Sequence, residues 1–351
     1  MPLLARMVAF PLAVDVRSGA VAGLGALLSD RLISAHGDVA VVVGPGQGEQ
    51  IAEVVGTSVG NAEMFGVDGG TLDAAQRLAD ALRQGSHDAV VGIGGGRTID
   101  VAKYAASLTG LPMVAVATSL AHDGIASPVA SLEHGGHKGS YGVHIPIGVI
   151  VDLDYVRRAP PEQLRSGVGD GLSNLSAVAD WQLAGRERGE PVDGLACALA
   201  RSGAESILHH DDDLLSDGFL TTLAEGLVLG GLAMAVAGSS RPCSGACHEI
   251  AHAIDQGWPG QAMHGEEVAV GALFASFLRE DPLVGLLDER LRRYGVARLP
   301  RDLGLTDDQF ADAVGRAPAT RPERYTILEH LDLGAAEIRA RVGAFVDAYD
   351  R

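Results

Sequence analysis

Carboxylate and imidazole side chains stand in otherwise apolar segments of the C-terminal half. Asp170 is flanked by glycines at the start of an apolar helical pattern, and His264 precedes another such pattern. His248 and His252 are four residues apart, so a helix presents both on one face. One carboxylate and two imidazoles, with a fourth position open, form the ligand set of a catalytic Zn²⁺ or Fe²⁺ site. The open position would let the metal polarise a substrate oxygen.

Residues 248–252 also read HEIAH, which matches the H-E-x-x-H helix of zinc proteases. In those enzymes both histidines bind zinc and the glutamate activates water. The extended form of the motif needs Gly and His where this chain has Asp255 and Trp258. In a second form of the motif the third zinc ligand is a glutamate further along the chain, which Glu266 or Glu267 could supply. A protease has no use for the glycine-rich phosphate loop described next, so we disfavour this interpretation.

The run Gly94-Gly95-Gly96 follows a short apolar stretch and precedes a helical pattern. Glycine lets the backbone approach a phosphate closely, and the first turn of a helix offers N–H donors. We expect Thr98 and Asp100 to cap that turn. Ile99 stands where the G-x-G-x-x-G pattern has its third glycine, so a tight turn without a ligand is the alternative. Residues 44–48, GPGQG, are the weaker candidate for a phosphate-binding loop because their proline has no N–H to donate.

A polar segment follows the next apolar run. It contains the hydroxyls of Thr118 and Ser119, the imidazole of His122 and the carboxylate of Asp123. Enzymes of the α/β class keep their working residues at the carboxyl ends of parallel strands. We therefore expect a functional loop here, with a capped turn as the alternative.

The pattern of elements divides the chain near Pro160. Before it, apolar runs at 39–43, 62–67, 88–93 and 113–117 alternate with helical patterns, which is typical of a parallel sheet. After it, strand patterns nearly vanish. We predict an α/β nucleotide-binding domain with a Rossmann-like parallel sheet at residues 1–160 and an all-helical domain at 161–351. The helices predicted in the second domain are 163–184, 194–209, 219–237, 246–255 and 266–278.

Composition narrows the possible partners and the location. The formal net charge of −18 disfavours a nucleic-acid partner but permits one small anionic substrate at a local basic or metal site. Three cysteines in 351 residues indicate reduced thiols in a cytoplasmic protein. The longest apolar run, 226–238, is shorter than the roughly 20 residues of a membrane span. We expect a buried helix there and no membrane span.

Six segments resemble the sn-glycerol-1-phosphate dehydrogenases. These enzymes belong to the wider group of iron-type alcohol dehydrogenases, glycerol dehydrogenases and dehydroquinate synthases. The resemblance implies a dehydroquinate synthase-like fold, a homo-oligomer, and hydride transfer between NAD or NADP and a small polyol phosphate or ketone phosphate. Its substrates would be dihydroxyacetone phosphate and sn-glycerol 1-phosphate. The segments lie between about Asp88 and Leu328 and read GIGGGRTIDVAKYAA, TSLAHDGIASP, GVGDGLSNLSAVADWQLA, SSRPCSGACHEIAHAID, HGEEVAVG and RPERYTIL.

The resemblance also implies a role for individual residues. Asp123 would contact the substrate, and His252 would be a substrate contact and candidate proton donor rather than a ligand. Asp170, His248 and His264 would bind Zn²⁺, with Fe²⁺ as the alternative. The cofactor would be bound by Gly94, Gly95, Gly96, Arg97, Thr98, Asp100, Thr118, Ser119 and Ser127.

The chain departs from the family pattern beside the ligands. Ala246, Cys247 and Ala251 replace a Ser, a Glu and a Ser, and residues 137–142 look unlike the family's usual lysine-containing stretch. Loss of the glutamate removes a charge that tunes the basicity of a neighbouring ligand. Two alternatives therefore stay open. One is the same chemistry on another small polyol or ketone, for example in secondary metabolism. The other is an NAD-using cyclase resembling dehydroquinate synthase, although that enzyme needs more basic residues around a phosphate. A degenerate binding protein is disfavoured by the complete ligand set.

Overall fold

The computed structural model describes residues 10–350 and divides into two compact units. The first unit ends at Pro160 and the second begins at Pro161. The strands of the first unit are β1 (Ala13–Arg17), β2 (Val39–Val43), β3 (Glu63–Gly66), β4 (Ala89–Gly94), β5 (Met113–Ala117), β6 (Val129–His134), β7 (His137–Gly142) and β8 (Gly148–Asp152). Its helical elements are η1 (Ala20–Gly23), α1 (Leu24–Asp30), α2 (Gly48–Ser58), α3 (Leu72–Leu82), α4 (Gly96–Thr109), η2 (Asp123–Ile125) and α5 (Leu153–Val156).

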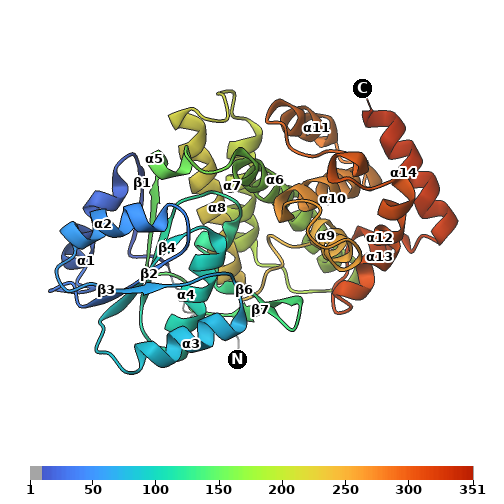
Figure 1. The fold of residues 1–351 in the computed structure, drawn as a ribbon. Helices are drawn as coiled ribbons and strands as arrows, with labels where there is room; N and C mark the ends of the chain where they lie inside the picture. Colours follow the sequence, from blue (N-terminus) through green and yellow to red (C-terminus); the bar gives the residue numbers. More distant parts are fainter. Residues whose placement is uncertain (1–9, 351) are drawn as a thin grey trace. The chain divides into compact units, whose positions relative to one another are not determined.

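Six strands form one sheet in the order β1-β8-β5-β4-β2-β3, and every neighbouring pair is parallel. Figure 1 labels four of these strands, β1 to β4, together with the helices α1 to α4. Buried β-branched side chains build its central strands, with Val41 of β2 opposite Val91 of β4. One face packs against Leu24 of α1 and Ile51 of α2 in a single apolar cluster. Helix α4 contacts β4 and β5, and α3 packs beside α4.

The strand order reverses between β2 and β4. The chain runs from β2 outward to β3, and then returns to place β4 on the other side of β2. Ligands of open parallel sheets bind at the carboxyl ends of the strands beside such a switch point. The two glycine runs singled out in the sequence follow these two strands. The two glycine runs therefore lie side by side at the carboxyl ends of adjacent strands, and they need not be alternative phosphate sites.

The sequence analysis named four of these strands and missed β1, β8 and the hairpin of β6 and β7. Strand β1 lies at the edge of the sheet, and the side chain of Val14 is exposed there, so its pattern is weak. The hairpin turns at Gly135 and Gly136, which both have positive φ, so that His134 pairs with His137. Its strands carry few apolar residues, which hid them.

The second unit is helical, and no strand occurs from residue 161 to residue 350. This confirms the predicted order of an α/β region followed by a helical one. The sequence analysis did not name the helices after residue 278, because their apolar patterns are short. The helices are α6 (Pro161–Arg188), α7 (Gly194–Leu208), α8 (Asp217–Ala237), α9 (Ala246–Gly257), α10 (His264–Leu278), α11 (Val284–Arg293), η3 (Pro300–Leu303), α12 (Asp307–Thr320), α13 (Ile327–Leu331) and α14 (Ala335–Tyr349).

Helix α8 is the one helix among residues 10–350 that is long and apolar enough to cross a membrane. Its most apolar window has a mean hydropathy of 1.7, and 67% of that window is buried inside the protein. The predicted run 226–238 therefore lies in a mostly buried helix that ends at Ala237, but that helix is 21 residues long, so the argument from the shortness of the run does not hold.

Candidate metal and cofactor sites

Three helices of the second unit bring the predicted metal ligands together. Asp170 lies on α6, His248 on α9, and His264 begins α10. One nitrogen or carboxylate oxygen of each residue lies within 4.8 Å of the others. His248 Nε2 is 3.8 Å from Asp170 Oδ1, and both side chains are largely buried. Two imidazoles and one carboxylate at this spacing are suited to hold Zn²⁺ or Fe²⁺ with a fourth position open.

Asp170 lies in the interior of α6, whereas the sequence analysis expected it at the start of its helix. The glycines on either side of it serve helix packing instead. A Cβ built on Gly169 would lie 2.1 Å from the carbonyl oxygen of Gly265, and one on Gly265 would lie 1.9 Å from the carbonyl oxygen of Ser166. The Gly265 N–H donates to Ser166 Oγ at 3.1 Å. Because Gly169 precedes Asp170 and Gly265 follows His264, this close crossing of α6 and α10 sets the distance between the two ligands.

His248 is held in a form that can bind metal. Burial lowers its pKa well below the usual value, and the neighbouring His264 and His252 add to the effect. Its Nδ1 lies 3.4 Å from Cys247 Sγ, and that thiol lies 4.0 Å from the carbonyl oxygen of Ser173. Burial raises the pKa of Cys247 to about 12, so the thiol is neutral. With Nδ1–H donating to sulfur, the lone pair of Nε2 faces Asp170.

His252 lies close to the ligands, with its ring centroid 6.2 Å from that of His264. Its Nε2 lies 3.3 Å from Arg321 Nη2. Since a guanidinium only donates, Nε2 must accept, and the proton of the neutral ring is on Nδ1. The sequence analysis did not identify Arg321 as a site residue, although the RPERYTIL segment contains it.

Glu249 does not belong to the ligand cluster, which argues against the protease interpretation. It is fully buried, and burial raises its pKa to about 8. Its Oε2 accepts from Thr326 Oγ1 at 3.1 Å, while the same hydroxyl oxygen lies 2.6 Å from Glu329 Oε2. A single hydroxyl proton cannot serve two carboxylates, so a proton on Glu249 satisfies the arrangement.

A second group of possible ligands shares His264. Asp255 and Glu267 each have a carboxylate oxygen within 4.8 Å of the other and of a His264 nitrogen. Glu267 is buried in α10 and was mentioned in the sequence analysis only as a protease ligand. One imidazole and two carboxylates are less suited to Zn²⁺ than the first group. A carboxylate beside a ligand histidine commonly orients its ring.

The first unit brings Thr98, Thr118 and Ser119 of the predicted cofactor residues together around the glycine run. A Cβ built on Gly94 would lie 2.7 Å from Thr98 Oγ1, one on Gly95 would lie 3.3 Å from Ser119 Oγ, and one on Gly96 would lie 2.2 Å from His122 Nε2. Gly95 is the N-cap of α4, and neither Thr98 nor Asp100 caps that helix, contrary to expectation. The amides of the first turn therefore remain available to a phosphate.

His122 was noticed in the sequence but given no role. Its Nδ1 accepts the Gly124 N–H at 3.0 Å, so in the neutral ring Nε2 bears the proton. That N–H lies over Gly96 at the start of α4. Thr118 adjoins the same turn, since its N–H donates to Gly94 O at 3.0 Å. The turn thus presents side-chain and backbone donors together.

A buried ion pair anchors the loop that contains Asp123. Lys103 is 1% exposed, and its Nζ lies 2.8 Å from Asp100 Oδ1. The same ammonium donates to Gly124 O at 2.7 Å and contacts the carbonyl oxygens of Ser127 and Val129. Asp100 Oδ2 also accepts from Ser131 N at 3.1 Å. Asp100 is thus bound to the protein itself, and sequence reasoning missed this role because Lys103 alone gave no pattern.

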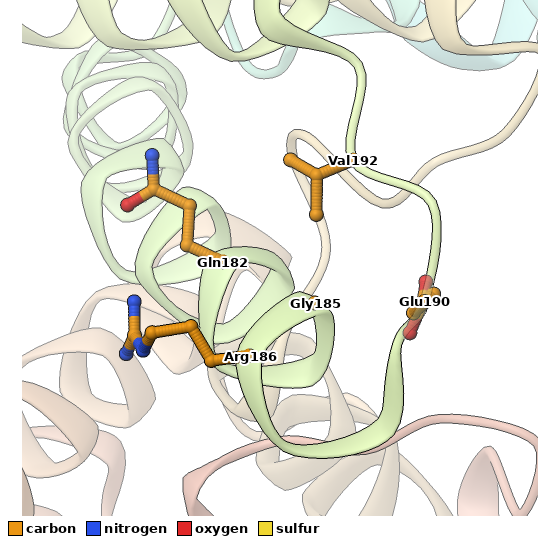
Figure 2. A pocket seen from close by; sticks show the side chains of 5 residues that line it. All are labelled: Gln182, Gly185, Arg186, Glu190 and Val192. Atoms are coloured by element: carbon orange, nitrogen blue, oxygen red, sulfur yellow. The ribbon is translucent and has the colours of Figure 1, made fainter.

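A surface hollow of the second unit lies along the end of α6 (Figure 2). Figure 2 shows Gln182 and Arg186 on the helix and Val192 on the segment that follows it. No predicted site residue lines this hollow. It is therefore separate from the candidate chemistry.

The comparisons with known proteins bear on the fold and the family of the chain. Residues 15–160 match the sequence profile of the iron-containing alcohol dehydrogenases. A probable glycerol dehydrogenase from Sinorhizobium meliloti superimposes with a TM-score of 0.76 at 22% identity, covering 99% of each chain. An iron-containing alcohol dehydrogenase from Corynebacterium glutamicum gives 0.74 at 19% identity, covering 97% of each. The fold is thus that of the iron-containing alcohol dehydrogenases and glycerol dehydrogenases.

The sequence relatives define the family within that class. The chain is 36% identical over 341 residues to glycerol-1-phosphate dehydrogenase [NAD(P)+] from Hyperthermus butylicus, covering 95% of this chain and 97% of the relative. It is 40% identical over 262 residues to the enzyme of the same name from Thermofilum pendens, covering 74% and 75%. The chain belongs to the glycerol-1-phosphate dehydrogenase family, which confirms the resemblance seen in the sequence.

Proposed function

We propose that this protein is an NAD(P)-dependent, metal-dependent dehydrogenase that interconverts dihydroxyacetone phosphate and sn-glycerol 1-phosphate. The observation that supports it most is the clustering of Asp170, His248 and His264 from three helices. It is joined by the 36% identity to a glycerol-1-phosphate dehydrogenase over nearly the whole chain.

Asp170, His248 and His264 hold the metal, for which we propose Zn²⁺. The ion supplies Lewis-acid polarisation of the ketone oxygen, and the reduced nicotinamide supplies the hydride. Cys247 orients His248 through Nδ1, so that Nε2 faces the ion. Asp255 or Glu267 orients His264 in the same way.

His252 supplies the proton that the substrate oxygen gains when the ketone is reduced, and it does so from the imidazolium form, whose ordinary pKa lies near neutral pH. Both ring nitrogens carry hydrogen in that form, so the Arg321 contact at Nε2 belongs to the neutral ring and opens when the ring is protonated. Asp123 orients a substrate hydroxyl, and Lys103 holds its loop in place through Gly124.

The glycine turn before α4 binds the pyrophosphate of NAD(P). The amides of residues 95–98 and the helix N-terminus meet the phosphate oxygens, with Arg97 exposed beside them. Thr118 and Ser119 adjoin this turn and bind the cofactor with it. Ser127 is 1% exposed and donates to Val129 O, so it shapes the loop as well.

Steady-state kinetics of the purified, Zn²⁺-loaded protein test this proposal. We expect oxidation of NADH or NADPH with dihydroxyacetone phosphate, and sn-glycerol 1-phosphate rather than its 3-phosphate enantiomer as product. Turnover only with other ketones would favour the alternative substrates, and a bound NAD that is never consumed would favour the cyclase. We also propose a cytoplasmic homo-oligomer, to be tested by cell fractionation and light scattering.

A further inference from the structure

Four arginines of the second unit are buried or half-buried: Arg241, Arg279, Arg321 and Arg324. Two of them are neutralised by carboxylates. Arg241 Nε and Nη2 donate to both oxygens of Glu190 at 2.8 Å, a side chain that appears in Figure 2. Arg279 Nη1 donates to Asp180 Oδ1 at 2.6 Å. These two guanidiniums have structural partners of opposite charge.

Arg324 is held by groups that do not neutralise it. It donates to Ser244 Oγ at 2.7 Å and to Ser240 Oγ at 2.6 Å. Its nearest carboxylate within ion-pair range, Glu323, is 3.9 Å away with a side chain that is 68% exposed. Burial lowers the pKa of Arg324, and the neighbouring Arg321 and Arg241 lower it further. The serines fix the direction of this guanidinium but leave its charge in place.

The positive charge of Arg321 is even less neutralised than that of Arg324. No carboxylate of residues 10–350 lies within 4.0 Å of its guanidinium, and its Nε is buried without a hydrogen-bond partner. Its Nη2 lies 3.3 Å from Nε2 of His252, which carries no negative charge. Two partly buried cations without a close anion are costly in a folded protein, and a bound anion relieves that cost. This positive cluster stands in a chain whose net charge is −18.

The cluster lies within reach of the candidate metal through one side chain. Arg321 contacts His252, whose ring centroid is 6.4 Å from His248 and 6.2 Å from His264. A substrate with its ketone oxygen at the metal and its anionic end at Arg321 would therefore extend past one side chain, the imidazole of His252. A planar guanidinium binds two oxygens of a phosphate at once.

We propose that Arg321, with Arg324 beside it, binds the phosphate group of the substrate and selects phosphorylated over unphosphorylated ketones. This inference deepens the proposed function and rests on it. The contact with His252 gives Arg321 a second effect, because a phosphate that draws the guanidinium away from Nε2 leaves the imidazole free to carry the proton that it supplies.

The test compares the Zn²⁺-loaded wild type with Arg321→Met, Arg321→Lys and the control Arg339→Met. The control removes one positive charge from α14, where the Arg339 side chain is 63% exposed. Kinetics are measured with dihydroxyacetone phosphate and with dihydroxyacetone, and inorganic phosphate is titrated calorimetrically into each protein. Thermal melting identifies any variant that fails to fold.

For Arg321→Met we expect KM for dihydroxyacetone phosphate and Kd for inorganic phosphate to rise roughly 10- to 100-fold. KM for dihydroxyacetone should change less than about twofold, Arg321→Lys should be intermediate because it keeps the charge but not the fork, and Arg339→Met should match the wild type. Equal rises in KM for both ketones, or unchanged phosphate binding, would overturn the inference. If the wild type does not reduce dihydroxyacetone phosphate, the proposed function fails, and the phosphate titration alone still decides the role of Arg321.

Discussion

Replacing Gly169 by alanine tests how the metal ligands are positioned. The new Cβ would lie 2.1 Å from the carbonyl oxygen of Gly265 and 3.0 Å from the Cβ of Ala269. A backbone oxygen cannot swing aside, so α6 and α10 must separate by about 1 Å to restore ordinary contact. Metal–ligand distances tolerate only a few tenths of an ångström. The substitution should therefore pull Asp170 and His264 apart.

Two effects of opposite sign set the stability change. Alanine favours a helix interior over glycine by about 1 kcal/mol, whereas overpacking costs about 1–3 kcal/mol. We expect a net loss of about 1 kcal/mol, a 10- to 100-fold weaker affinity for Zn²⁺, and a kcat lower by about 100-fold. The matched control is Gly343→Ala on α14, where a Cβ would meet nothing within 4 Å. This control should gain stability and keep the affinity of the wild type.

Competition with a fluorescent zinc chelator gives the metal affinity, and calorimetric melting of the metal-free protein gives the stability. If Gly169→Ala binds Zn²⁺ as tightly as Gly343→Ala and is equally stable, then the close crossing of α6 and α10 does not position the ligands.

Four further changes probe the rest of the account. Asp170→Ala should abolish stoichiometric metal binding in elemental analysis, and full retention would contradict the assignment. Gly96→Ala should weaken NADH binding at least about tenfold in a fluorescence titration, because its Cβ would lie 2.2 Å from His122 Nε2; unchanged binding would remove the turn from the cofactor site. Lys103→Met should cost about 3–5 kcal/mol in chemical denaturation, since it leaves a buried carboxylate unpaired; a change below about 1 kcal/mol would contradict this. Glu249 has a pKa raised to about 8, so the metal-free folded protein keeps a proton that the unfolded chain releases near its ordinary value. Stability should therefore fall by up to about 1.4 kcal/mol per pH unit between about pH 5 and pH 8, and Glu249→Gln should abolish this slope.

The sequence predicted those parts of the fold that depend on local pattern. Buried strands such as 39–43 and 113–117 are unbroken apolar runs, and the long helices after Pro160 contain many apolar residues. Strand β1 escaped notice because an edge strand exposes one of its faces. The hairpin escaped because its stability comes from the positive-φ turn at Gly135 and Gly136.

The same distinction holds for the candidate site. His248, His252 and His264 stand out in sequence because imidazoles are uncommon in apolar helices. Arg321 could not be found this way, since its lack of a neutralising partner is a property of packing between distant segments. The interpretation of Asp170 as a helix start also failed for this reason, because Gly169 packs against Gly265 and Gly171 against Ile207, both on other helices.

The central claim is that Asp170, His248 and His264 bind the metal on which reduction of a ketone phosphate depends. The most direct measurement is NADH oxidation with dihydroxyacetone phosphate by chelator-stripped protein, before and after stoichiometric Zn²⁺ is restored, for the wild type and His264→Ala. The account predicts that Zn²⁺ restores activity to the wild type and that His264→Ala neither retains the ion nor recovers. Full activity in the stripped wild type, or equal recovery by the variant, would contradict it.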